Sequence, residues 1–90
     1  MLSAQLKLIN PLGLHARAAS KLVDLAKTFA SDIHIATSAK SVDAKSIMNI
    51  LLLGAPVGTE LTVTVEGDDE DQAFGLVCDL INAGFHELDQ

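Results

Sequence analysis

Hydrophobic and polar residues alternate along four stretches of the chain, which is the pattern of strands with one buried face. Residues 2–8 and 61–66 show this alternation over their whole length. Shorter versions lie at residues 33–35 and around Val42, on either side of a turn. The sequence therefore predicts four strands, each with one face toward a core and the other toward solvent.

Three other stretches repeat their apolar residues at the spacing of a helix. Residues 16–29 place apolar side chains on one helical face and charged ones on the other. A shorter helix is predicted over residues 46–53, and Gly54 after it suits a left-handed C-terminal cap. The third helix is expected to begin at Asp68, its predicted N-cap, and to end at Gly84.

In chain order these elements read βαββαβα. A four-stranded antiparallel sheet covered on one face by three helices is an α+β open-faced sandwich, in which each element buries its apolar side against the other layer. No linker or repeat interrupts the 90 residues, so we expect a single domain over residues 1–90. Hydrophobic residues make up 49% of the chain and aromatic ones only 3%, which predicts an aliphatic core.

Charge narrows the classes of partner. The formal net charge of −6 argues against nucleic acid as the main partner. Residues 1–45 carry six basic and three acidic side chains, a balance of +3, whereas residues 46–90 carry nine acidic and no basic ones, a balance of −9. This asymmetry is either an accident of the solvated surface or a positive face that attracts an anionic ligand or an acidic protein.

The choice of cellular compartment rests on one cysteine and on the absence of long apolar runs. Cys78 is the only cysteine, so no internal disulfide forms and a reducing compartment is favoured. The first residues lack the basic start and apolar run of a signal peptide. The longest apolar stretch, residues 50–53, is far shorter than the roughly 20 residues of a membrane span. We therefore expect a cytoplasmic protein with no membrane partner.

His15 is the strongest candidate for chemistry, because it lies where a turn passes into the first helix. The first backbone N–H groups of a helix lack intrahelical partners and the helix dipole is positive there, which makes a site for phosphate. The small Ala16 leaves these N–H groups accessible, and Arg17 adds a planar, charged fork for phosphate oxygens. An imidazole nitrogen is also a nucleophile that forms covalent intermediates. A histidine at a helix start is equally an ordinary cap or surface residue, so local chemistry leaves both interpretations open.

Three motifs in register resolve this choice. Gly-Leu-His-Ala-Arg at residues 13–17 is followed by Lys-Ser-Ile-Met at 45–48 and by Gly-Thr-Glu-Leu at 58–61. Together they resemble the HPr family, the phosphocarriers of the bacterial phosphoenolpyruvate-dependent phosphotransferase system, over essentially the whole chain. The resemblance implies that enzyme I passes a phosphoryl group to Nδ1 of His15 and that an EIIA-type domain then takes it, through a loose in-line transition state. It also implies a monomeric carrier rather than an enzyme, with no cofactor and no metal.

Ser46 has two interpretations. It suits the N-cap of the short helix, and that role needs no regulation. In the family, this serine is also the target of an HPr kinase/phosphorylase in many bacteria. A phosphate there adds roughly two negative charges, which weaken binding to an acidic partner.

The resemblance further implies a docking surface for enzyme I and EIIA on and beside the short helix. The alternative is that its apolar residues are plain core, and we favour docking. Met48 suits such a surface because its flexible thioether adapts to different partners. The expected docking residues are Ser20, Lys21, Lys27, Ile47, Met48 and Leu51.

The chain departs from the family pattern at Ala18, where family members usually have proline. Alanine restores a free N–H at the third helical position, and this donor is expected to reach either the His15 ring or a phosphate oxygen. The ending at residues 80–85 is similar to nitrogen-related carriers, so between sugar uptake and a regulatory nitrogen relay we favour the relay. The main rival is an HPr-like regulatory binding module without phosphoryl chemistry, against which His15 and Arg17 argue. A standalone enzyme ranks third, because no second catalytic group accompanies His15.

Overall fold

All seven predicted elements occur in the predicted order in the computed structural model, which describes residues 1–87. The strands are β1 (Leu2–Lys7), β2 (Asp32–Ala36), β3 (Ser41–Asp43) and β4 (Glu60–Glu66). The helices are α1 (Ala16–Ala26), α2 (Ile47–Leu52) and α3 (Glu70–Asn82). A short C-terminal turn, Gly84–His86, follows α3 and was not predicted.

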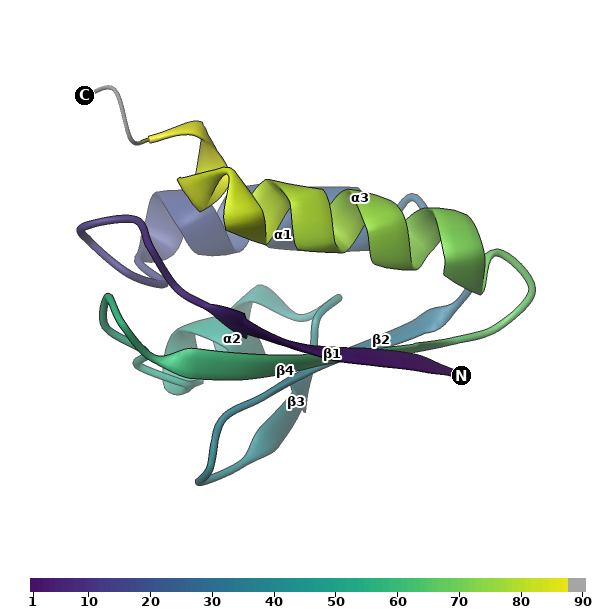
Figure 1. Ribbon diagram of the computed structural model, residues 1–90, viewed down its shortest axis with the longest axis horizontal. Coiled ribbons are helices and arrows are strands. Elements are labelled where there is room, and N and C mark those ends of the chain that lie inside the picture. The colour runs from purple at the N-terminus through teal and green to yellow at the C-terminus, as the bar shows by residue number, and fades with distance from the viewer. Residues whose placement is uncertain (88–90) are drawn as a thin grey trace.

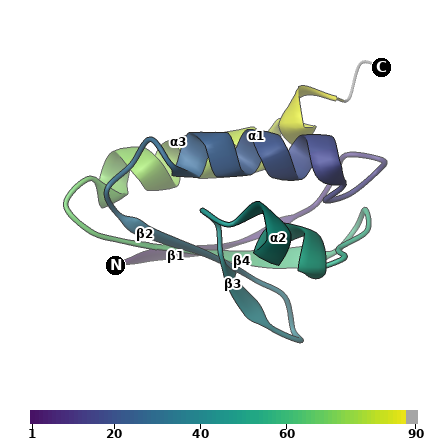
Figure 2. The same ribbon diagram turned by 180° about the vertical axis from the view of Figure 1, so that it is seen from behind.

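The strands form one antiparallel sheet in the order β1-β4-β2-β3. Helices α1 and α3 run side by side across one face of this sheet (Figure 1). Helix α2 packs against α1 and β3 (Figure 2). The predicted open-faced α+β sandwich is therefore confirmed.

The core between the two layers is mainly aliphatic, as the composition predicted. The alternation of β4 is realised, because Leu61, Val63 and Val65 are fully buried while the residues between them are only partly buried. Phe85, at the C-terminal end of the described chain, is the largest fully buried side chain. The other fully buried large aliphatic side chains are Leu8, Leu22, Ile33, Ile35, Ile50, Val77 and Ile81.

The boundaries of α1 and α2 differ slightly from those predicted. Helix α1 ends at Ala26, because the N–H groups of Thr28 and Phe29 bond three residues back in a tighter turn. Helix α2 is followed by Gly54 with a φ of 57°, so the predicted left-handed residue is confirmed. Among residues 1–87, no helix combines the length and the apolar character that crossing a membrane would require.

The predicted N-cap of α3 is wrong by one residue. The cap position is Asp69 rather than Asp68, and the Asp69 side chain makes no capping hydrogen bond. Its carboxylate instead accepts hydrogen bonds from the loop between α1 and β2, at the N–H groups of Ala30 and Ser31 and at the Ser31 hydroxyl. Two adjacent aspartates suit a helix start equally well, and this tertiary contact selects between them.

Candidate functional site

His15 is the N-cap of α1, as predicted. Its backbone is extended, with φ −82° and ψ 178°, and its carbonyl accepts the first helical hydrogen bond from the Ala19 N–H. The ring nitrogen Nδ1 accepts a hydrogen bond from the backbone N–H of Arg17 at 3.3 Å. The imidazole therefore takes the place of the hydroxyl or carboxylate oxygen that usually caps a helix. Its Nδ1 atom lies among the free N–H groups at the helix start.

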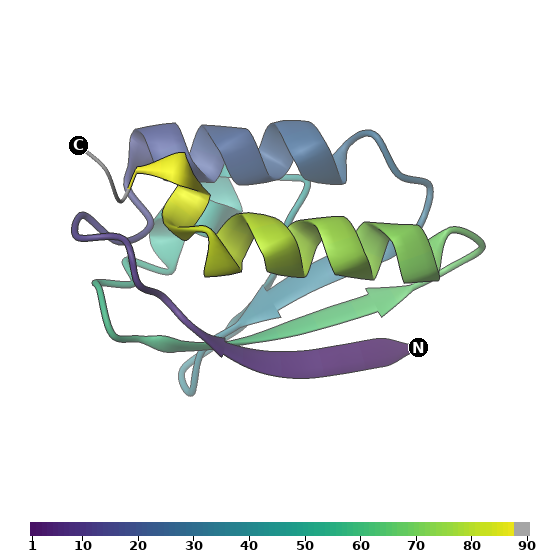
Figure 3. The same ribbon diagram turned by 45° about the horizontal axis from the view of Figure 1, so that its top comes forward.

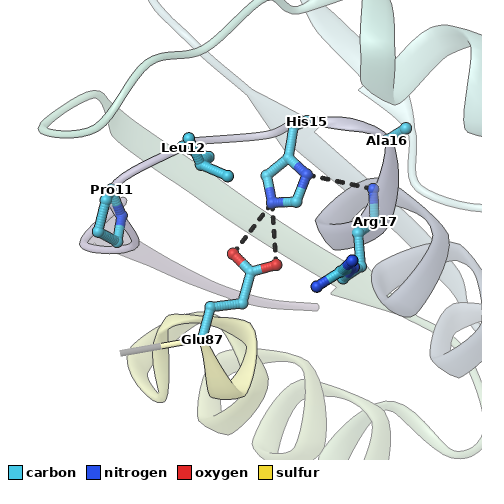
Figure 4. A pocket seen from close by; sticks show the side chains of 6 residues that line it. All are labelled: Pro11, Leu12, His15, Ala16, Arg17 and Glu87. Atoms are coloured by element: carbon cyan, nitrogen blue, oxygen red, sulfur yellow. Dashed lines mark hydrogen bonds and ion pairs between the residues drawn. The ribbon is translucent and has the colours of Figure 1, made fainter. Parts of the chain in front are cut away.

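The other ring nitrogen of His15 faces a carboxylate from the far end of the chain. The Nε2 atom lies 2.9 Å from Oε2 and 3.0 Å from Oε1 of Glu87 (Figure 4). Glu87 directly follows the C-terminal turn, which lies beside the start of α1 (Figure 3). The side chain of His15 is 26% exposed, whereas that of Glu87 is only 6% exposed. The two ring nitrogens thus have different partners.

Asn10 holds the carboxylate of Glu87 from the other side. Its Nδ2 atom donates to Glu87 Oε1 at 2.9 Å and to the carbonyl oxygen of Gly13 at 2.7 Å. The amide nitrogen must face these two acceptors, because an amide oxygen in its place would meet a carbonyl and a carboxylate. Asn10 is fully buried. Its hydrogen bonds connect the loop after β1 with the start of α1 and with the end of the described chain.

The network keeps Glu87 ionised. The hydrogen bond with His15 lowers the pKa of the Glu87 carboxyl below its usual value, and the bond from Asn10 acts in the same direction. Burial of the carboxyl opposes this shift, and the positive charge of Lys21 supports it. A buried carboxylate with hydrogen-bond donors on both oxygens is a stable acceptor for the Nε2–H of His15.

The turn that brings Glu87 to His15 has an unusual backbone. Gly84, Phe85 and His86 have φ angles of 62°, 56° and 60°, in the left-handed region. Left-handed conformation costs about 1–2 kcal/mol for each residue other than glycine. Two contacts oppose this cost: the Phe85 side chain is fully buried, and its carbonyl oxygen accepts a hydrogen bond of 2.6 Å from Lys21 Nζ. The core and α1 together determine where Glu87 lies.

An open hollow of about 430 Å³ lies in front of the histidine ring. Its lining residues are Pro11, Leu12, His15, Ala16, Arg17 and Glu87 (Figure 4). Ala16 and Arg17 are exposed at this surface, as their predicted contact with a phosphate requires. The hollow is accessible from outside, so a group bound to another protein can approach the ring.

Two partners were expected as alternatives for the Ala18 N–H, the His15 ring and a phosphate oxygen. The N–H that reaches the ring belongs instead to Arg17, at the second helical position, so the first alternative is not realised. Ala18 is fully buried against the core. Its contact with a phosphate oxygen stays a prediction.

Ser46 is the N-cap of α2, as predicted. Its Oγ accepts a hydrogen bond from the Asn49 N–H at 3.4 Å. The apolar residues next to it are not plain core: Ile47 is 40% exposed, Met48 66% and Leu51 36%, while Ile50 alone on this helix is buried. We call Ile47, Met48 and Leu51 the α2 patch.

The other predicted docking residues lie on α1 and just beyond it. Ser20 and Lys21 are partly buried, and Lys27 is exposed. Helix α2, which carries the patch, packs against α1, which carries Ser20 and Lys21. Leu12 and Leu52 are further exposed apolar residues that sequence reasoning did not select.

Sequence reasoning also missed Glu87 and Asn10. Glu87 lies 72 residues from His15 and 77 from Asn10 along the chain, and no local pattern joins them. Only the concentration of acidic residues in the second half hinted at a carboxylate partner for the basic first half.

The fold presents a histidine at a helix start in an open hollow, where a group carried by another protein can reach it. A family model described as the PTS HPr component phosphorylation site matches residues 2–83. Phosphocarrier protein HPr of Cupriavidus necator is 41% identical over 87 residues, covering 97% of this chain and 98% of the relative. Phosphocarrier protein NPr of Shewanella violacea is 40% identical, covering 96% of this chain and 94% of the relative.

The same likeness is found among solved structures. A crystal structure of HPr from Thermoanaerobacter tengcongensis aligns with a TM-score of 0.92 at 40% identity, covering 97% of this chain and 98% of that one. The chain belongs to the HPr family of phosphocarriers. It is therefore a carrier in the phosphotransferase system and is not itself a catalyst.

Proposed function

We propose that His15 accepts a phosphoryl group on Nδ1 from enzyme I and passes it to an EIIA-type domain. One observation carries this proposal: Nδ1 accepts the Arg17 N–H while Nε2 faces an ionised carboxylate. A nitrogen that accepts a hydrogen bond has its lone pair in the plane of the ring, whereas a nitrogen facing a carboxylate carries the proton. Nδ1 is therefore the nucleophile, and it is also the nitrogen at the helix start.

Transfer is a matter of alignment and charge. The Nδ1 lone pair forms the new bond to phosphorus as the bond to the donor residue of enzyme I breaks, and the donor keeps that electron pair. The exposed Arg17 guanidinium and the N–H groups of Ala16 and Arg17 bind the phosphoryl oxygens. The same steps in reverse order deliver the group to EIIA.

The test is labelling by phosphoenolpyruvate and enzyme I. Wild type gains one acid-labile phosphoryl group by intact mass, and His15→Ala gains none. His34→Ala is the matched control, since His34 is an exposed histidine on β2 and its loss leaves labelling unchanged. Equal labelling of His15→Ala and wild type contradicts the proposal. A wild type that is never labelled favours the HPr-like regulatory binding module instead.

We propose that enzyme I and EIIA dock on the α2 patch and on Ser20, Lys21 and Lys27. Exposed apolar residues beside basic side chains match a partner surface that is apolar at its centre and acidic around it. Met48→Asp, which puts a charge in the patch, raises the KM for this carrier in the enzyme I assay without unfolding it. An unchanged KM excludes docking at this site.

We also propose that phosphorylation of Ser46 by an HPr kinase/phosphorylase regulates docking, since the phosphate charge would lie beside the α2 patch. Ser46→Asp is expected to slow phosphoryl acceptance from enzyme I. Ser41→Asp, which adds the same charge on β3, is the control. Equal rates in the two variants count against regulation.

The remaining proposals concern branch, assembly and compartment. We propose the regulatory nitrogen relay, tested by comparing transfer to nitrogen-type and sugar-type EIIA domains. We propose that the protein is cytoplasmic. We also propose that it is a monomer, because one chain supplies His15, Asn10 and Glu87. Light scattering after size exclusion tests the assembly, and a dimer mass contradicts it.

A further inference from the structure

We propose that Glu87 is a positioning residue for phosphoryl transfer: it holds the Nε2–H of His15 and so keeps Nδ1 unprotonated, with its lone pair at the start of α1. This inference rests on the proposed function of His15. It starts from the two contacts of 2.9 and 3.0 Å between Nε2 and the carboxylate. Both oxygens lie within hydrogen-bonding distance of the same nitrogen, so small movements of the ring keep the interaction.

The environment of this pair separates it from an ordinary surface ion pair. Exposed pairs contribute little, because solvent screens them and both side chains lose freedom. Glu87 is 6% exposed, and its carboxylate is also bonded to the buried Asn10. The carboxylate is thus fixed before any partner arrives.

The turn before Glu87 adds a second constraint. The buried Phe85 side chain and the Lys21 ammonium, which donates to the Phe85 carbonyl, hold three successive left-handed residues in place. Two of these residues are not glycine, and strain of this kind persists only where the surrounding structure determines it. The turn held in this way places the Glu87 carboxylate next to Nε2 of the histidine ring.

An ionised carboxylate has only acceptor atoms, so the nitrogen facing it must carry the proton. The neutral ring is held as the Nε2–H tautomer, and its lone pair is at Nδ1. When the bond from Nδ1 to phosphorus forms, the ring becomes positively charged and the Nε2 proton stays between the ring and Glu87. The carboxylate stabilises this positive charge, much as carboxylates orient metal-bound and catalytic histidines.

The charged groups around the ring agree with this arrangement. Lys21 from α1 lies near the Glu87 carboxylate and supports its ionised form, and Arg17 lines the hollow. Asn10, from the loop after β1, contributes a neutral amide. Among residues 1–87, no acidic side chain other than Glu87 forms a hydrogen bond or ion pair with the ring.

Glu87→Gln tests the inference, because it keeps the shape of the side chain and removes its charge. A glutamine amide can donate to Nε2 as well as accept from it, so the ring is no longer restricted to one tautomer. We expect the phosphoryl acceptance rate to fall by about 10–100-fold, the usual effect of losing a partner that orients a functional histidine. We expect the loss in kcat, with KM for the carrier unchanged, since Glu87 lies outside the proposed docking residues.

The second readout needs no partner protein. In ¹⁵N NMR spectra of the free protein, wild type has a proton-bearing Nε2 and an unprotonated Nδ1, and Glu87→Gln shows a mixture of both tautomers. Glu66→Gln removes one exposed carboxylate from β4 and is the control for net charge. Glu87→Asp keeps the charge but withdraws it by one methylene, so its rate falls between those of wild type and Glu87→Gln.

Each outcome decides the inference. A Glu87→Gln protein that transfers within twofold of Glu66→Gln overturns it, and so does a changed tautomer with an unchanged rate. A Glu87→Gln protein that fails to fold leaves Glu87→Asp to decide, and an Asp variant as fast as wild type overturns the inference. If enzyme I never labels wild type, the proposed function fails, while the tautomer measurement still reports on Glu87 alone.

Discussion

Asp69 is the N-cap of α3, and Glu87 follows the turn after the other end of that helix. Each carboxylate accepts hydrogen bonds from a loop next to α1. Asp69 accepts hydrogen bonds of 2.9 Å from the N–H groups of Ala30 and Ser31, and a further bond from the Ser31 hydroxyl. Glu87 accepts from Asn10 and faces His15. We call the first region the brace end and the second the site end.

The two regions use the same chemical group for different purposes. At the brace end all donors are backbone amides and a hydroxyl, which do not change protonation during function. At the site end one of the partners is His15, the proposed nucleophile. The comparison shows that a buried or bridging carboxylate is not a functional signal by itself, because the partner's chemistry decides whether the contact is structural or also serves transfer.

Among the substitutions that test this difference between the two ends, Phe85→Ala should have the largest effect on stability and on phosphoryl acceptance. Removing a fully buried aromatic side chain costs about 3–5 kcal/mol of unfolding free energy. The loss also releases the left-handed turn, so Glu87 leaves the His15 ring and phosphoryl acceptance falls. Urea unfolding measures the first effect and the enzyme I assay the second. Phe74→Ala, at a half-buried position on α3, is the control and should cost less. Equal losses in the two variants would show that the turn is not anchored by its phenyl ring.

This turn also marks where sequence reasoning reached its limit. The four strands and three helices were predictable, because period-2 and period-3.6 patterns are local properties of the chain. The cap positions of His15 and Ser46 were predictable for the same reason. The left-handed backbone at Phe85 and His86 was not, since only long-range packing makes that conformation favourable in residues other than glycine.

The contacts of Glu87 and Asp69 were beyond prediction for a related reason. A strand or helix pattern says which face of an element is buried, but not which loops meet at the ends of the layers. Asp68 and Asp69 are equally good caps by sequence, and only the approach of Ser31 distinguishes them. Arg17 and Ala16, by contrast, lie next to His15 in sequence and were placed correctly beside it.

Paired glycine substitutions should have the next largest effect. Gly13, with a φ of 66°, would place a Cβ 2.9 Å from Pro56 Cα, and Gly67 would place one 2.6 Å from Ser31 Cα. Gly13→Ala and Gly67→Ala should each lose about 2–3 kcal/mol, as overpacking of a close contact does. Only Gly13→Ala should also slow phosphoryl acceptance, because the Gly13 carbonyl holds Asn10. Assays at a temperature where both variants are folded separate the effect on stability from the effect on transfer. An equal loss of phosphoryl acceptance in the two variants would mean that the site end is no more important for transfer than the brace end.

The free energy of unfolding that Asp69 contributes at the brace end should depend on pH. The Ser31 hydroxyl, followed by the Ala30 amide, lowers the pKa of Asp69 below its ordinary value. A carboxyl with a lowered folded-state pKa stabilises the protein above its unfolded-state pKa of about 4, and this contribution is lost as pH falls through the folded value. Asp69→Asn should therefore be less stable than wild type at pH 7 and equal to it once the pH lies below both values.

Urea unfolding over a pH series measures this convergence. Asp68→Asn is the control, because the Asp68 side chain makes no hydrogen bond within residues 1–87. A constant difference between Asp69→Asn and wild type at every pH would mean that the lost contribution is packing rather than ionisation. Phosphoryl acceptance at pH 7 should be unchanged in Asp69→Asn, in contrast to Glu87→Gln.

Two lysines offer the smallest and most closely matched test. Lys21 Nζ donates to the Phe85 carbonyl at 2.6 Å at the site end, and Lys45 Nζ donates to the Phe29 carbonyl at 2.8 Å at the brace end. Methionine keeps most of the side-chain length and removes the donor, so each variant should lose about 1 kcal/mol. Because Lys21 is also a proposed docking residue, the transfer rate cannot separate its two roles. The ¹⁵N signals of the His15 ring in the free protein can: Lys21→Met should loosen the turn and alter them, whereas Lys45→Met should leave them as in wild type. Equal changes in both variants would mean that the two ends of the helical layer respond as one unit and that Glu87 is not held by local contacts.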